Sequence, residues 1–106
     1  MFEENVTEIG DHNCDDFLLR EISILSFVSE NCMRCLMSLP ILDSLAEEFS
    51  EKIFFGKVNV DEFNSLAERH NISSVPTVLI FKNGEELDRV LNFDSEEDLR
   101  ERLSFL

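Results

Sequence analysis

The sequence predicts an α/β domain with a central mixed β-sheet of about five strands, the last two antiparallel, flanked by about four helices. Short apolar runs rich in strand formers alternate with segments of helical periodicity. The last two apolar runs are joined through Asn83-Gly84, which is a strong hairpin signal. A chain of 106 residues, 43% hydrophobic and 30% charged, suits one compact domain. We therefore expect a single domain over residues 1–106.

The first elements are a weak extended segment and a short helix. Residues 5–9 form the extended segment, and Asp11 is placed to cap a helix over residues 13–20. Phe17 and Leu18 are expected to face inward from this helix.

A central strand and the longest helix follow. Residues 22–28 are almost continuously apolar, which is typical of a strand covered on both faces. Residues 34–49 show helical spacing, with Glu47 and Glu48 on the solvent side. The apolar positions of this helix are Leu36, Leu39, Leu42, Leu45, Ala46 and Phe49. We expect a kink at Pro40, because proline removes a backbone donor and clashes with the preceding turn.

The second half continues the alternation and then changes it. Residues 53–59 are predicted to form a buried strand, and residues 64–70 a short helix with Leu66 and Ala67 inward. Residues 77–81 and 87–91 are predicted to form the antiparallel hairpin. Ser95 is placed to cap a last helix, with Asp98 at the capping-box position. Its apolar stripe contains Leu99, Leu103 and Leu106.

The charge balance excludes some partners. A net charge of −14 repels nucleic acid and anionic membrane surfaces, so we expect neither as a partner. The excess of acidic over basic residues favours solubility. The alternative is that acidic patches steer the domain toward basic partners. Acidic residues and no basic residue precede Arg20, so the start does not resemble a signal peptide, and no apolar run approaches membrane-spanning length. Three cysteines are not a secreted disulfide framework, so we expect a cytoplasmic protein. We also expect a monomer.

Two motifs carry the chemistry. Cys32-Met33-Arg34-Cys35 places two thiols two residues apart where an apolar run gives way to a helix, so they can close and reopen a disulfide ring. In Ser74-Val75-Pro76-Thr77 the proline opens an apolar segment, which is a plausible site for a cis peptide bond. Together the motifs indicate a dithiol-disulfide site.

Buried apolar thiols and half of a zinc site are the alternatives. Structural zinc needs four ligands, and only His12, Cys14 and His70 remain, none of them in a second Cys-x-x-Cys pair. We therefore expect no metal, while a metal shared between two chains stays open. Cys14 is expected to be a core residue, with a regulatory disulfide or glutathionylation as the minor alternative.

Over nearly its whole length the chain resembles a thioredoxin. The segments that carry the resemblance are residues 26–35, Pro40 to Asp43, Gly56 to Asp61, Val75-Pro76-Thr77 and Phe81 to Gly84. The resemblance implies the thioredoxin fold and a protein-disulfide oxidoreductase that needs no further cofactor. It also implies disulfide-containing protein substrates and an electron donor that resembles thioredoxin reductase.

The cysteine roles follow from their places on the helix. Cys32 sits where unsatisfied backbone N–H groups and the helix dipole favour a thiolate, so it is expected to be the nucleophile. Cys35, one turn along and more buried, is expected to resolve the mixed disulfide. The resemblance further implies that Pro76 lies against the cysteines and that the backbone of Val75 pairs with an incoming peptide.

The chain departs from the thioredoxin pattern at four places. Asn31 replaces a tryptophan, Met33-Arg34 replaces Gly-Pro, Ser26 replaces a buried aspartate, and Asn92 replaces a glycine. Asn31, Met33 and Asn92 are therefore expected to alter recognition of substrate and reductase. The Arg34 cation favours the Cys32 thiolate, which predicts a potential less negative than the roughly −270 mV of thioredoxin.

Ser26 and Lys57 are expected to change proton handling. Ser26 cannot accept the Cys35 proton as a carboxylate does, although its hydroxyl is able to bind a water. Lys57 matches the lysine that partners the family's buried aspartate. Here it either favours a Cys35 thiolate directly, or it extends to solvent and pairs with an acid such as Asp61.

Two functions other than that of an ordinary thioredoxin remain open for this chain: a more oxidising oxidant or isomerase, and a redox-silent interaction module.

Overall fold

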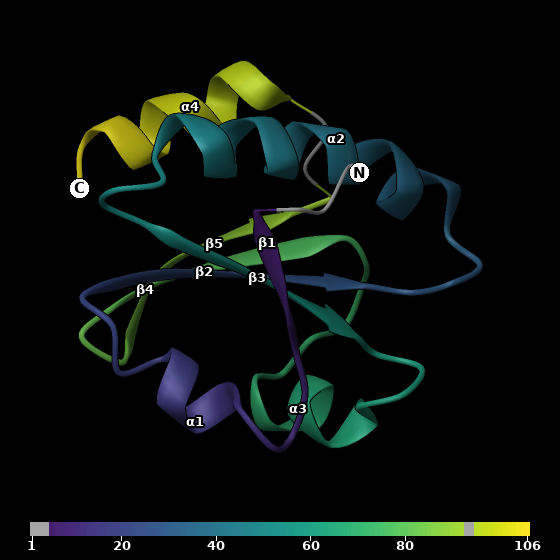
Figure 1. Ribbon diagram of the computed structural model, residues 1–106. Coiled ribbons are helices and arrows are strands. Elements are labelled where there is room, and N and C mark those ends of the chain that lie inside the picture. Colours follow the sequence, from purple (N-terminus) through teal and green to yellow (C-terminus); the bar gives the residue numbers. More distant parts are fainter. Residues whose placement is uncertain (1–4, 93–94) are drawn as a thin grey trace.

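The structure is a computed structural model that describes residues 5–92 and 95–106. Residues 1–4 and 93–94 of the expected single domain lie outside the described residues. In the described part, five strands form one sheet and four helices cover it, as expected (Figure 1). The elements are β1 (Val6–Ile9), α1 (Cys14–Phe17), β2 (Ile22–Val28), α2 (Met33–Glu48), β3 (Phe54–Asn59), α3 (Asn64–Arg69), β4 (Thr77–Lys82), β5 (Glu85–Leu91) and α4 (Glu96–Ser104).

The sheet is mixed, with strand order β1-β3-β2-β4-β5. The strand β2 is central: it pairs parallel with β3 and antiparallel with β4, and all seven of its residues are buried. The strands β4 and β5 form the predicted antiparallel hairpin. Its turn contains Asn83 at φ 51° and Gly84 at φ 85°, the left-handed conformations that Asn-Gly turns require. The predicted mixed sheet is therefore confirmed.

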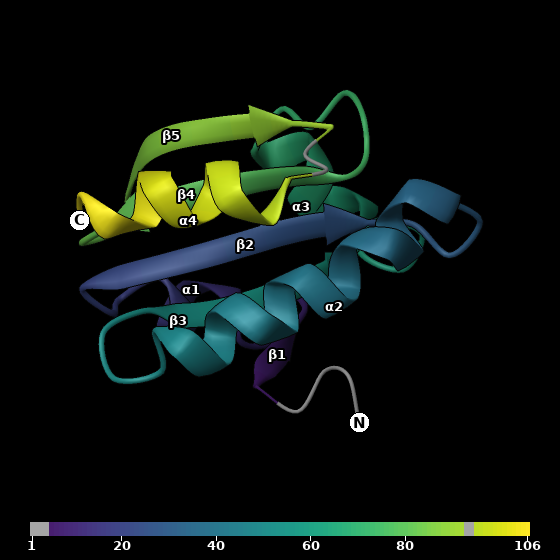
Figure 2. The same ribbon diagram turned by 90° about the horizontal axis from the view of Figure 1, so that it is seen from above.

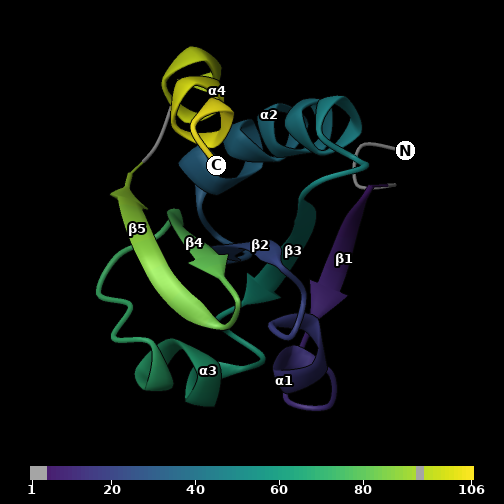
Figure 3. The ribbon, with the colours of Figure 1, turned by 90° about the vertical axis from the view of Figure 1, so that its left-hand side faces the viewer.

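The helices form two layers. The helices α2 and α4 cover one face of the sheet, and α1 and α3 cover the other (Figure 3). Alternate residues of β2 supply the two cores because strand side chains point to opposite faces. Ile24 packs in the cluster with Leu42 and Leu99, whereas Leu25 packs in the cluster with Phe17. Seen from above, α4 lies over β4 and α2 crosses toward β3 (Figure 2).

The expected first helix is shorter than predicted and is not capped by Asp11. The helix α1 ends at Phe17, and its N-cap is Asn13, whose side chain makes no capping hydrogen bond. Instead, the Asn13 side chain accepts the N–H of Gly10 at 2.8 Å and donates to the Glu8 carbonyl at 3.0 Å. The Asp11 carboxylate accepts from the Ser65 hydroxyl at 2.9 Å, so it serves the contact between α1 and α3.

One residue of the apolar stripe predicted for α2 is exposed rather than buried. Leu36 is 56% exposed, beside Met33 at 70% and Met37 at 67%. The first turn of α2 extends past the end of β2 (Figure 2). Pro40 lies inside the helix, and the expected kink there stays a prediction.

The predicted cap and core face of α4 are confirmed. The Ser95 hydroxyl accepts the N–H of Asp98 at 3.1 Å, which satisfies a donor that the first helical turn leaves unpaired. Leu99 and Leu103 are buried, and Leu106 packs against the same core. The helix α4 therefore closes the sheet beside α2.

Candidate active site around Cys32 and Cys35

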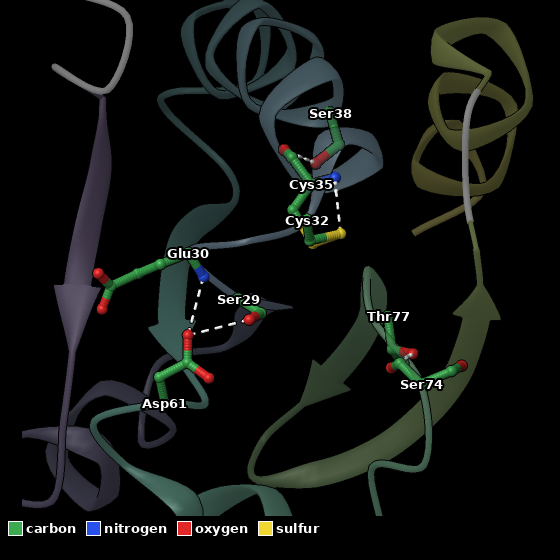
Figure 4. The surroundings of a disulfide bond; sticks show 8 residues. All are labelled: Ser29, Glu30, Cys32, Cys35, Ser38, Asp61, Ser74 and Thr77. Carbon is green, nitrogen blue, oxygen red and sulfur yellow. Dashed lines mark hydrogen bonds between the residues drawn. A yellow bond between two sulfur atoms is a disulfide. The ribbon is translucent and has the colours of Figure 1, made fainter.

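Cys32 and Cys35 form a disulfide at the start of α2, with their Cα atoms 5.2 Å apart (Figure 4). Cys32 is the N-cap residue, in an extended conformation, and its Sγ accepts the backbone N–H of Cys35 at 3.1 Å. Cys35 is buried and Cys32 is only partly buried. The sulfur at the positive end of the helix is therefore the one that solvent and a partner reach first.

Hydrogen bonds tie each side of the disulfide to its surroundings. On the helix side, the buried Ser38 hydroxyl donates to the Cys35 carbonyl at 2.7 Å (Figure 4). On the loop side, the Asp61 carboxylate accepts from the Ser29 hydroxyl and from the Glu30 N–H, each at 2.9 Å. The hydrogen bond from the Glu30 backbone, followed by that from Ser29, lowers the pKa of Asp61. The carboxylate therefore holds the loop that leads into the motif.

The contact of Asp61 with the loop before Cys32 was not predicted from the sequence, where Asp61 was considered only as a partner for Lys57. The available signal was the polar Asn59-x-Asp61 pattern directly after a buried strand. The Asn59 side chain accepts the Asp61 N–H at 2.9 Å and donates to the Glu30 carboxylate at 3.2 Å. The end of β3 thus positions the loop that follows β2.

The Val75–Pro76 peptide bond is cis, as the sequence predicted. The Thr77 hydroxyl donates to the Ser74 carbonyl at 2.7 Å, and both residues lie across from the disulfide (Figure 4). The Pro76 carbonyl accepts the N–H of Asn92 at 2.8 Å. Asn92 has φ 50°, a left-handed conformation that asparagine tolerates better than most residues.

A pocket of about 430 Å³ lies behind the disulfide. Its walls come from all three parallel strands, from α2 and from the three loops that follow these strands. The lining residues that matter for chemistry are Cys35, Lys57, Glu8, His12, Glu30 and Glu62. Burial lowers the pKa of Lys57.

Ser26 lies beside Lys57 in the register of β2 and β3. It is fully buried, and its hydroxyl has no hydrogen-bond partner among the described residues. Where the resembled family has a buried carboxylate, this chain therefore has an unpaired hydroxyl.

The residues expected to contact substrates differ in their exposure. Asn31, Met33 and Arg34 are exposed around the motif, Val75 is partly buried and Pro76 is buried. Asn92 is exposed and joined to the proline loop by its N–H. The proline loop thus lies across from the disulfide (Figure 4), and the residue after β5 is hydrogen-bonded to it.

Cys14 and His70 belong to the opposite face of the sheet. Cys14 is a buried core thiol, as expected, and burial raises its pKa. His70 packs between Phe27 and Phe81, where burial lowers its pKa. Within residues 5–92 and 95–106, no group of three or more His, Cys, Asp or Glu side chains is placed to hold a metal ion.

No helix in the described part is long and apolar enough to cross a membrane.

Comparisons with known proteins agree with this geometry. The family model described as Thioredoxin matches residues 5–104. The chain is 35% identical over 94 residues to a thioredoxin of Chlamydia caviae, covering 89% of this chain and 91% of that one. It is 33% identical over 96 residues to a thioredoxin of Staphylococcus saprophyticus, covering 91% and 92% of the two chains.

Solved structures with a similar fold are also thioredoxins. A mutant thioredoxin from Halobacterium salinarum superposes with a TM-score of 0.88 at 25% identity, covering 95% of this chain and 89% of that one. A thioredoxin from Malassezia sympodialis gives a TM-score of 0.86 at 24% identity, covering 94% and 89%. These superpositions confirm the thioredoxin fold. Because the family model spans nearly the whole chain and the Cys-x-x-Cys pair closes a disulfide at the start of α2, the chain belongs to the thioredoxin family of protein-disulfide oxidoreductases.

Proposed function

We propose that this thiol-disulfide oxidoreductase exchanges electrons with disulfide-containing proteins through Cys32 as nucleophile and Cys35 as resolving thiol. The observation that carries the assignment is the asymmetry of the pair: Cys32 is partly exposed at the N-cap and its Sγ accepts a backbone N–H, whereas Cys35 is buried. A hydrogen bond from a backbone amide at a helix N-terminus stabilises a thiolate, which is the nucleophilic form.

The exchange conserves atoms and electrons. The Cys32 thiolate attacks one sulfur of a substrate disulfide, so a mixed disulfide forms and the first substrate thiolate leaves. Cys35 then attacks the Cys32 sulfur, which forms the intramolecular disulfide and releases the second substrate thiolate. The substrate gains two electrons and the protein is oxidised by two.

Recognition is proposed to use the rim around Cys32. Met33 and Asn31 offer a soft apolar contact and a polar one, and the backbone of Val75 pairs with an extended segment of the substrate. Pro76 and Asn92 shape the opposite side, where the Asn92 N–H is already engaged by the proline carbonyl. Because the rim lacks tryptophan, substrates and the reductase are expected to differ from those of ordinary thioredoxins.

Arg34 is proposed to make the disulfide more oxidising. Its cation in the first turn of α2 favours the reduced, thiolate form of Cys32 by Coulomb attraction. Its exposure screens this effect, so we expect a potential only moderately above the roughly −270 mV of thioredoxin. A potential well above this range would instead indicate an oxidant or isomerase.

We further propose a cytoplasmic monomer that receives electrons from a donor resembling thioredoxin reductase. The support is an odd number of cysteines with Cys14 as a free thiol, which suits a reducing compartment. The net charge of −14 supports the proposal that neither nucleic acid nor a membrane is a partner.

The test is the redox equilibrium of the Cys32–Cys35 pair in glutathione buffers, read by alkylation and mass spectrometry. The oxidised form takes up one alkyl group, at Cys14, and the reduced form takes up all three, so the two states are separated by mass. The Cys32→Ser variant is the control. A reversible two-electron couple supports the proposal, and two thiols that do not interconvert would show a redox-silent interaction module.

A further inference from the structure

The side chain of Arg89 joins β5 to the end of α3. Its two terminal nitrogens donate to the carbonyl of His70 at 2.7 Å and to that of Asn71 at 3.0 Å. His70 is the C-cap residue of α3, and Asn71 has a left-handed φ of 56°. A carbonyl at a helix end has no partner within the helix, and the helix dipole favours a cation beside it. The guanidinium group therefore closes the C-terminal end of α3 from the outermost strand of the sheet.

A bulge in β5 supplies the partner that holds Arg89. In the pairing with β4, Glu86 and Asp88 oppose consecutive residues, so Leu87 is an extra residue in β5. In a regular strand, residues three apart point to opposite faces of the sheet. The bulge removes one alternation and lets Glu86 reach Arg89 on the same face. The Glu86 carboxylate accepts two hydrogen bonds from Arg89, each at 2.9 Å, and these bonds lower the pKa of Glu86.

The segment that Arg89 holds runs directly into the proline loop. Val75 follows Asn71 by four residues and packs against the core on the side of the sheet that α3 covers (Figure 3). At the other end of this segment, the Pro76 carbonyl accepts the N–H of Asn92, directly after β5, at 2.8 Å. The strand β5 thus fixes the loop on both sides of Val75, through the Arg89 side chain before it and through a backbone N–H after it.

The position of this loop matters for one class of substrate. Peptide pairing at Val75 requires its backbone groups to be aligned with those of the incoming segment. A loop that is held in place before binding loses less conformational entropy when the substrate arrives. A small disulfide that reaches only Cys32 makes no such pairing. Contacts that hold the loop are therefore expected to act on protein substrates and not on small disulfides.

We propose that Arg89 is a positioning residue for protein disulfides: its contacts with Glu86 and with the end of α3 hold the proline loop in the conformation that pairs with an incoming peptide segment. The proposal rests on the proposed function, in particular on peptide pairing at Val75. Arg89 takes no part in the exchange itself, since bonds and electrons pass only between Cys32, Cys35 and the substrate.

The experiment compares a protein disulfide with a small one as oxidants of the same two thiols. Reduced protein is mixed with excess insulin, and the loss of its thiols with time is read by acid quenching, alkylation and mass spectrometry. The second oxidant is dipyridyl disulfide, an uncharged probe whose first released thiopyridone reports attack by Cys32. The variants are Arg89→Met and Arg89→Lys. The matched control is Arg102→Met, which removes an equal charge and the 2.6 Å ion pair between Arg102 of α4 and Asp88 of β5.

Arg89→Met is expected to lower the second-order rate constant with insulin about tenfold, because a small displacement of a binding element costs at least this much in rate. Its rate with dipyridyl disulfide stays at the wild-type value, which also shows that the site is folded. Arg89→Lys keeps the cation but not the fork of donors, so its rate with insulin lies between those of the wild type and Arg89→Met. Arg102→Met behaves as the wild type with both oxidants.

Three results would overturn the role of Arg89: a wild-type rate with insulin in both Arg89 variants, equal losses in Arg89→Met and Arg102→Met, or an equal loss with both oxidants. A wild-type protein that dipyridyl disulfide oxidises and insulin does not would instead overturn the proposed function.

Discussion

Two serines of β2 are expected to respond in opposite ways to the same substitution. Ser23 and Ser26 are both 0% exposed. The Ser23 hydroxyl donates to the Phe17 carbonyl at 3.2 Å, whereas the Ser26 hydroxyl has no partner among the described residues. Ser26→Ala removes an unsatisfied buried group and is expected to stabilise the protein. Ser23→Ala removes a hydrogen bond and is expected to destabilise it.

The expected change in unfolding free energy for each variant follows from the hydrogen bonds that its hydroxyl group makes. A buried polar group without a partner costs about 1–3 kcal/mol, so deleting the Ser26 hydroxyl is expected to gain about 1 kcal/mol after the loss of its packing contacts. Deleting the Ser23 hydroxyl is expected to cost about 1 kcal/mol. The loss is limited because the Phe17 carbonyl also accepts the N–H of Arg20, at 3.4 Å.

The assay is urea unfolding of the oxidised proteins followed by far-ultraviolet circular dichroism, because the chain has no Trp or Tyr to report by fluorescence. With a slope of about 1–3 kcal/mol per molar urea, a change of about 1 kcal/mol moves the midpoint by about 0.3–1 M. The midpoint rises for Ser26→Ala and falls for Ser23→Ala, with the slope unchanged. Equal falls in both variants would refute the reasoning, because they would show that the Ser26 hydroxyl is hydrogen-bonded in solution.

Three further outcomes are expected. Arg34→Met makes the disulfide potential more negative by up to about 30 mV in the glutathione equilibrium, and an unchanged potential would show that this charge does not act on Cys32. Gly56→Ala lowers unfolding stability by about 1–3 kcal/mol in urea, because a Cβ would lie 2.6 Å from Ile9 Cγ1. The lowered pKa of Asp61 means that its contribution to stability is present above the unfolded pKa and is lost as pH falls through the folded one. Asp61→Asn should therefore show a flatter decline of the urea midpoint in acid, and parallel declines in the two proteins would contradict this reading.

Local sequence was enough for features that neighbouring residues determine. Asn83-Gly84 predicted its hairpin because few residues adopt positive φ easily, and Ser95 predicted its cap because its hydroxyl reaches an amide three residues away. The apolar run of β2 predicted a central strand because only such a strand is covered on both faces.

Other features depended on contacts between distant segments. Asp11 has the side chain of a helix cap, yet it binds Ser65, which is 54 residues away. Leu36 fits the apolar period of α2, yet it is 56% exposed and lines the pocket behind the disulfide near the start of the helix. Periodicity identifies a face of a helix, but it does not show where along the helix the neighbouring layer ends.

The sequence by itself determined the chemistry of this protein: a Cys-x-x-Cys pair at a helix start and a Val-Pro-Thr step, recognisable because exchange needs two thiols within one turn. The tertiary structure alone decided which charges and hydrogen bonds surround that pair. It set Asp61 against the loop before Cys32, gathered Cys35 and Lys57 around one pocket, and gave Ser23 a partner while leaving Ser26 without one among the described residues. These differences arise between residues far apart in the chain, where burial and register rather than residue type set the energy of a polar group.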